Sequence, residues 1–181
     1  MEQIERYPGE DFEIVEAMRQ YESVWKIRRK IDDKIFLLKK TPNLDGDSAT
    51  KLLLNAECRL LQACQSPFNV KLDVVFKHSD CLFIVIEFIE GEDLSKIIKH
   101  QHYTEDFIKY TIWSVANGLK VLHENNVVHR NLRPENILCN GNGSVKVSDF
   151  ANSRILTSDS VYTRRRLSGA WSYMPPEVLS G

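Results

Sequence analysis

The chain changes character at the turn Glu90-Gly91-Glu92, and this change limits the folds open to it. Before the turn, residues 12–40 read as short apolar runs separated by polar turns, which predicts a small antiparallel sheet. Two further strands are predicted over 70–76 and 82–88. Between them and the first sheet segments, apolar residues at helical spacing predict one helix over 52–64, which Ser66-Pro67 ends. The first half is therefore rich in strands.

After the turn, the apolar residues recur with helical spacing. We expect a short helix over 94–100 and a longer helix that Thr104 caps. The apolar residues expected to share one face of the longer helix are Phe107, Ile108, Ile112, Val115, Leu119 and Leu122. The runs 137–139 and 145–147 are joined by Asn140-Gly141-Asn142-Gly143, which is typical of a β-hairpin. Strands followed by helices indicate an α+β fold.

Composition and charge exclude several classes of function. The 181 residues include 24 basic and 25 acidic side chains, so the formal net charge of −1 gives no argument for nucleic acid or an anionic membrane as a partner. The N-terminus lacks the pattern of a secretory signal, and no segment has the apolar length of a membrane span, so we expect a cytoplasmic protein. The scattered cysteines are expected to be buried thiols rather than metal ligands; they are Cys58, Cys64, Cys81 and Cys139.

Short motifs follow one another in the second half of the chain. They are His129-Arg130-Asn131, Asn136, Ser148-Asp149-Phe150-Ala151 and Met174-Pro175-Pro176-Glu177. In this order and spacing they resemble the catalytic and activation segments of the serine/threonine protein kinases. The stretch Gly169–Glu177 is most similar to the sterile-twenty-like branch, which contains the Hippo-type and p21-activated kinases.

This resemblance implies a bilobal protein-kinase fold. Residues 1–11 then form an N-terminal extension, 12–89 a sheet-containing N-lobe with one helix, and 90–181 part of a helical C-lobe. Kinases of this family continue through further helices beyond the position of Glu177. We therefore expect a C-terminally truncated member of the family.

The resemblance also implies a site for ATP and magnesium. Lys39 matches the lysine that grips the nucleotide phosphates, and Glu57 matches the helix carboxylate that pairs with it. Asn136 and Asp149 match the metal-binding positions, whose amide and carboxylate oxygens suit a hard cation such as magnesium. The other positions that match nucleotide contacts are Val24, Leu37, Glu87, Ile89 and Leu138.

The chain departs from the family pattern at the residues that move the proton. Asn131 stands where the family has its catalytic aspartate, and an amide does not accept a proton near neutral pH. Arg133 replaces the neighbouring lysine, and Ala170 replaces the threonine whose hydroxyl bridges that lysine and the aspartate. Proton transfer and its supporting bridge are thus both altered.

Further departures affect the nucleotide and the activation segment. The glycines of the phosphate-covering loop are replaced by Ala17, Arg19 and Glu22, so side chains fill the room that phosphate needs. Leu37 replaces a small alanine over the adenine, which predicts poor nucleotide binding. Arg166 takes the place of the activation-loop threonine, which removes that phosphorylation site.

These losses favour a pseudokinase, a kinase-shaped module that binds another protein, such as an active kinase, and acts as a scaffold or allosteric partner. ATP and magnesium are then expected to bind weakly or not at all. Two alternatives remain. The chain is a weakly active ATP-dependent serine/threonine protein kinase, because Lys39, Glu57, Asn136 and Asp149 are retained, or it is a truncated fragment without function.

Overall fold

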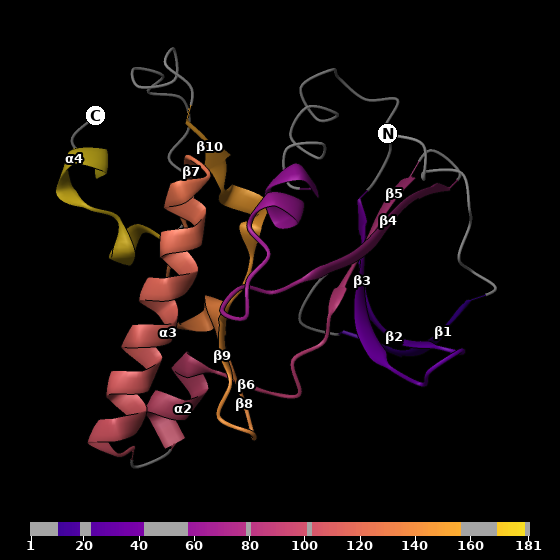
Figure 1. The fold of residues 1–181 in the computed structure, drawn as a ribbon, viewed down its shortest axis with the longest axis horizontal. Helices are drawn as coiled ribbons and strands as arrows, with labels where there is room; N and C mark the ends of the chain where they lie inside the picture. The colour runs from indigo at the N-terminus through magenta and orange to yellow at the C-terminus, as the bar shows by residue number, and fades with distance from the viewer. Residues whose placement is uncertain are drawn as a thin grey trace. The chain divides into compact units, whose positions relative to one another are not determined.

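The computed structural model describes residues 11–18, 23–41, 58–78, 81–100, 103–156 and 170–179. The chain forms two compact units (Figure 1). Unit 1 consists of Met1–Cys58 and Lys71–Phe88, and unit 2 consists of Arg59–Val70 and Ile89–Gly181. Residues 59–70 therefore belong with the later part of the chain, although they precede two strands of unit 1 in sequence.

Unit 1 is built on a five-stranded sheet with the order β1-β2-β3-β5-β4, and every neighbouring pair in it is antiparallel. The strands are β1 (Phe12–Ala17), β2 (Val24–Arg29), β3 (Ile35–Thr41), β4 (Leu72–His78) and β5 (Cys81–Glu87). The predicted antiparallel sheet and the two later strands are confirmed, with small shifts at the strand ends.

The core of unit 1 lies on one face of this sheet. Ile27 and Phe36 are paired across β2 and β3, and both side chains are buried together with Val85 from β5. Phe76 of β4 stacks on Phe83 of β5, with 5.0 Å between the ring centroids. These large apolar side chains come from four strands and fix the strand register, since a slip of one residue would turn each of them to the other face.

The two predicted helices of the second half are confirmed. Helix α2 spans Leu94–His100, and helix α3 spans Glu105–Glu124. Thr104 is the N-cap of α3, and its hydroxyl oxygen accepts a hydrogen bond from the backbone N–H of Phe107 at 3.2 Å. Of the helix predicted over 52–64, residues 58–63 are helical, and its first part lies outside the described residues.

The buried face of α3 differs from the predicted apolar face. Ile112 is 65% exposed and Ile108 is 41% exposed. The residues that α3 buries are instead Thr111, Ser114, Gly118 and Leu122. Three of these are small, so they let the helix approach its neighbours closely, and apolar periodicity alone does not detect such a face.

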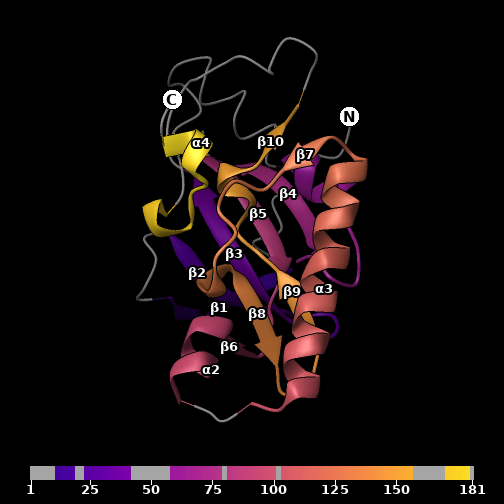
Figure 2. The same cartoon turned by 90° about the vertical axis from the view of Figure 1, so that its left-hand side faces the viewer.

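Short strands complete unit 2 (Figure 2). Strands β8 (Ile137–Asn140) and β9 (Val145–Val147) form the predicted hairpin, and β6 (Gly91–Asp93) pairs with β8 in the order β6-β8-β9. A second sheet pairs β7 (Val127–Val128) with β10 (Arg154–Ile155). The sequence did not predict β6, β7 or β10, because strands of two or three residues carry too little periodicity.

The remaining elements are single turns. They are the 3-10 helices η2 (Pro134–Asn136), η3 (Phe150–Asn152) and η5 (Trp171–Tyr173) and the short helix α4 (Pro176–Leu179). None of the helices among the described residues combines the length and apolarity needed to cross a membrane. The thiols of Cys64 and Cys139 are buried as predicted, whereas Cys58 and Cys81 are only partly buried.

Candidate functional site

The β8–β9 hairpin brings the predicted metal-binding residues together within unit 2. Asn136 ends η2 just before β8, and Ser148 follows β9 directly. The backbone N–H and the hydroxyl of Ser148 both donate to the carbonyl oxygen of Asn136, at 2.8 and 3.0 Å. Asp149, the next residue, is therefore held beside Asn136.

The pairing of β7 with β10 brings the segment around His129 to the same place. The guanidinium Nε of Arg130 donates to the carbonyl oxygen of Asn152 at 2.7 Å, and the hydroxyl of Ser153 donates to that of His129 at 3.3 Å. Strands β7 and β10 lie side by side (Figure 2), and these two bonds join residues that follow β7 to residues that precede β10. The segment after β7 and the segment after Asp149 are thus fastened to each other.

Asn131, Asn136 and Asp149 meet in one cluster, which we call the Asn–Asp corner. The amide Nδ2 of Asn131 donates to Oδ2 of Asp149 at 2.8 Å. The amide Nδ2 of Asn136 donates to the same carboxylate oxygen at 3.3 Å and to the backbone oxygen of Asn131 at 2.7 Å. At the position of the family's catalytic base, the chain therefore presents a hydrogen-bond donor to the carboxylate.

His129 holds the backbone next to the Asn–Asp corner. Its side chain is only 2% exposed, and its ring lies edge-on against Phe150 with 5.4 Å between the centroids. The Nε2 atom lies 2.9 Å from the carbonyl oxygen of Ser148, and Nδ1 accepts from the backbone N–H of Asn131 at 3.3 Å. Burial lowers the pKa of His129. The neutral imidazole, protonated on Nε2, satisfies both bonds, so His129 positions the loop.

Arg133 pairs with a neighbour rather than with Asn131. Its Nε donates to the Glu135 carboxylate at 2.7 Å, and this bond lowers the pKa of Glu135 to about 2. Ala170, at the position of the family threonine, is partly buried and carries no hydroxyl. Within the described residues, no side chain bridges Arg133 and Asn131 as the family's lysine and threonine do.

The predicted nucleotide-contacting residues of unit 1 lie on neighbouring strands. Val24 of β2 is the cross-strand partner of Lys39 on β3, and Leu37 lies two residues before Lys39 on that strand. Glu87 ends β5, where its carboxylate accepts from the backbone N–H of Lys71 at 2.7 Å. All four predicted side chains are partly buried. The sheet therefore groups Val24, Leu37 and Lys39, as a common site requires.

The other predicted residues fall elsewhere. Ile89 and Leu138 belong to unit 2 and are partly buried, with Leu138 paired to Asp93 across β6 and β8. Glu57 lies outside the described residues. Ala17, at the first loop-glycine position, ends β1 and is exposed, while the predictions made for Arg19, Glu22 and Arg166 also lie outside the described residues.

The donor chemistry of the Asn–Asp corner fits a divalent cation. Asn136 uses its Nδ2 to bond the backbone of Asn131, which leaves its amide oxygen for a ligand role, and the neighbouring Asp149 carboxylate is exposed. A magnesium ion held by these oxygens would neutralise charge on nucleotide phosphates. Among the described residues, no cluster of three or more histidine, cysteine, aspartate or glutamate side chains offers another metal site.

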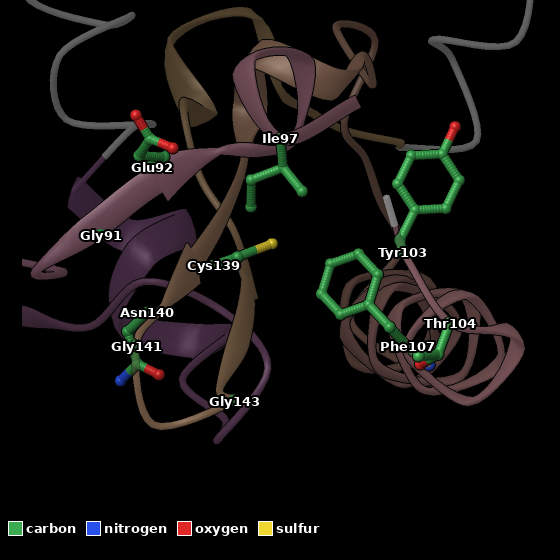
Figure 3. Close-up of a pocket in the computed structure, with 10 residues that line it drawn as sticks. All are labelled: Gly91, Glu92, Ile97, Tyr103, Thr104, Phe107, Cys139, Asn140, Gly141 and Gly143. Atoms are coloured by element: carbon green, nitrogen blue, oxygen red, sulfur yellow. The ribbon is translucent and has the colours of Figure 1, made fainter. Parts of the chain in front are cut away.

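Unit 2 also contains a pocket that the sequence did not predict (Figure 3). It has a volume of about 490 Å³, and its lining includes Gly91, Ile97, Tyr103, Phe107 and Cys139. Figure 3 shows the Ile97, Cys139 and Phe107 side chains directed toward one space. Burial raises the pKa of the Cys139 thiol to about 11, so this cysteine is protonated near neutral pH. None of the predicted site residues lines this pocket.

Comparison with known proteins identifies the family. The protein kinase domain family matches residues 20–181. The chain is 32% identical over 178 residues to Protein kinase 2 of Dictyostelium discoideum, covering 95% of this chain and 36% of that protein. It is 31% identical to Mitogen-activated protein kinase kinase 1 of Arabidopsis thaliana, over 94% of this chain and 49% of that protein.

It is also 30% identical to the human Serine/threonine-protein kinase Nek2, over 95% of this chain and 42% of that protein. The chain thus spans between about a third and a half of the length of these relatives. Because the family match begins at residue 20 and takes in the Asn–Asp corner, the chain belongs to the protein kinase family, with its α+β fold.

Proposed function

We propose that this protein kinase domain is a pseudokinase of the sterile-twenty-like branch, impaired in phosphoryl transfer and acting as a scaffold or allosteric partner. The observation that carries the proposal is the Asn131 amide, which donates to the Asp149 carboxylate at 2.8 Å. A donor at this place has no lone pair suited to take the proton of a substrate hydroxyl. The branch assignment is supported by the residues from Gly169 to Glu177.

The loss of the catalytic base is accompanied by two other changes that affect phosphoryl transfer. Loss of general-base catalysis costs a factor of about 10² to 10⁴ in rate. Arg133 bonds Glu135, and Ala170 has no hydroxyl, so the groups that support the base in the family are missing as well. The loop glycines are also replaced. A transfer reaction would have to survive all three changes, which favours a role in binding.

A protein is the partner that the chain's chemistry supports, and an active kinase is one candidate. The net charge of −1 gives no electrostatic support for nucleic acid or an anionic membrane as the partner. The segment 170–179 presents Trp171, 66% exposed, and Tyr173, 53% exposed, and such aromatic residues are enriched at protein interfaces. The cytoplasmic location expected from the sequence stays a prediction.

A weakly active serine/threonine protein kinase is the second candidate. It is supported by the convergence of Asn136 and Asp149 at 3.3 Å, by the place of Lys39 beside Val24 in the sheet, and by relatives that are named protein kinases. Phosphoryl transfer depends mainly on positioning and charge neutralisation, so these residues favour residual activity. This candidate requires ATP and magnesium to bind.

A phosphoryl-transfer assay separates the two candidates. The purified chain is incubated with radiolabelled ATP, magnesium and a mixed serine/threonine peptide substrate, and Asp149→Asn serves as the matched blank. The pseudokinase proposal predicts no transfer above this blank, and it predicts that Asn131→Asp alone does not restore robust transfer because Ala170 remains. Transfer by the unaltered chain above the Asp149→Asn level would refute the proposal and support the weak kinase.

A further inference from the structure

The Asp149 carboxylate is exposed and accepts hydrogen bonds from two side-chain amides. Its Oδ2 accepts from Nδ2 of Asn131 at 2.8 Å and from Nδ2 of Asn136 at 3.3 Å. Hydrogen bonds to a charged acceptor are stronger than those between neutral groups. Two protein amides therefore stabilise one oxygen of this carboxylate. In a metal-dependent site, a bound cation plays that role.

The backbone at Asp149 explains why such donors matter. Asp149 has φ 61° and ψ 75°, which is the left-handed region, and a residue with a side chain is uncommon there. The preceding residue, Ser148, bonds the Asn136 carbonyl oxygen, and the next side chain, Phe150, is buried against His129, so the chain on either side of Asp149 is fixed. The bond from Asn131 gives the strained residue a fixed side-chain direction.

We propose that Asn131 is a positioning residue whose amide holds Asp149 in place of a divalent cation, so that the Asn–Asp corner is assembled without metal. Asn131 also lowers the affinity of the corner for magnesium, because a cation must compete with the amide for Oδ2. Aspartate at this position would place an oxygen where Nδ2 lies, 2.8 Å from Asp149 Oδ2. Two ionised carboxylates at that distance repel each other unless a cation or a shared proton lies between them.

This inference goes beyond the proposed function, since it concerns how the corner is held and not whether phosphate is transferred. It predicts that the unaltered chain is indifferent to magnesium when no nucleotide is present. It also predicts that removing the amide exposes a dependence on metal. Both expectations are tested by thermal unfolding, which does not require enzymatic activity.

The experiment compares the melting temperature of the full chain with those of Asn131→Ala and Asn131→Asp, each in EDTA and in millimolar magnesium chloride. In EDTA, Asn131→Ala is expected to melt about 3–12 °C lower, as loss of one hydrogen bond to a charged group implies. Asn131→Asp is expected to melt lower still in EDTA and to recover in magnesium. The unaltered chain should melt at the same temperature in both.

Asn142→Asp is the matched control, because it adds the same charge in the exposed β8–β9 turn. Its melting temperature should not respond to magnesium. The proposal is overturned if Asn131→Ala is as stable as the unaltered chain in EDTA, or if magnesium raises the unaltered chain as much as it raises Asn131→Asp. Should Asn131→Asp fail to fold, the Asn131→Ala comparison still decides. Phosphoryl transfer by the unaltered chain would refute the proposed function but not this inference.

Discussion

Replacing Gly118 by alanine is expected to destabilise unit 2, although alanine is the better helix former. Gly118 lies on the buried face of α3, against the segment that carries Phe68 and Asn69. A Cβ atom there would lie 2.7 Å from Oδ1 of Asn69, and 3.1 Å from both the Phe68 carbonyl oxygen and Cγ2 of Val147. The close approach of three elements therefore depends on the missing side chain.

The magnitude follows from two opposing effects. Alanine stabilises a helix interior by about 1 kcal/mol relative to glycine. If Asn69 stays in place, overpacking costs up to about 3 kcal/mol. If Asn69 moves, it loses the bonds from its Nδ2 to the carbonyl oxygens of Cys64, at 3.0 Å, and Gly118, at 3.2 Å, at about 1 kcal/mol each. After the helix gain is subtracted, the net loss is about 1–2 kcal/mol, or about 2–8 °C in melting temperature.

Chemical and thermal unfolding measure this loss. Gly141→Ala is the matched control, because nothing lies within 4 Å of its added Cβ, and its effect should stay within about 0.5 kcal/mol. The double variant with Asn69→Ala should lose less than the sum of the single variants, since the clash is relieved. The reasoning is refuted if Gly118→Ala is as stable as the unaltered chain, or more stable.

The remaining predictions concern a buried histidine, a helix cap and a strand contact. Burial lowers the pKa of His129 in the folded chain, so as the pH falls the imidazole is protonated in the unfolded chain before it is protonated in the folded one. The free energy of unfolding should therefore fall below pH 6.5, by up to about 1.4 kcal/mol per pH unit. Urea unfolding at a series of pH values should show a shallower fall for His129→Phe. Thr104→Ala removes the N-cap of α3 and should cost about 1 kcal/mol in urea unfolding, whereas equal stability would argue against the cap. Gly91→Ala places a Cβ 2.0 Å from the carbonyl oxygen of Cys139, so hydrogen exchange should show loss of protection in β6 and β8, and unchanged protection would contradict the close contact.

Local chemistry made part of this fold predictable. Thr104 predicts the start of α3, and Asn140-Gly141-Asn142-Gly143 predicts the β8–β9 hairpin. Each of these signals depends only on interactions between residues that are close together in the sequence. The pairings of β6 with β8 and of β7 with β10 join segments far apart in sequence. Strands of this length form only because the rest of unit 2 brings them together, so no local pattern predicts them.

The buried face of α3 shows where apolar patterning fails. Ser114 and Gly118 are small or polar, so apolar patterning predicts that they lie at the surface. They are buried on the face of α3 that contacts β9. Ile112 reads as core and is exposed. Close packing rewards small side chains where backbones approach each other, and apolar periodicity does not record this.

The candidate site was predicted through its residue types, but not through its bonds. The resemblance to protein kinases singled out Asn131 as a lost base and Asn136 and Asp149 as metal-binding positions. The sequence gives no hydrogen-bond direction, so the donation from Asn131 to Asp149 emerged only from the three-dimensional arrangement. The residue that the family pattern marks as a lost catalytic base therefore also makes a hydrogen bond to Asp149.

The most direct test of the central claim is an NMR measurement of the Asn131 side-chain amide. Its resonances are assigned by their disappearance in Asn131→Asp and are compared with those of the exposed Asn142. A bond to Asp149 at 2.8 Å predicts slowed exchange with solvent and a chemical shift that moves in Asp149→Asn but not on adding magnesium alone. Exchange as fast as that of Asn142, or no response to Asp149→Asn, would contradict the account.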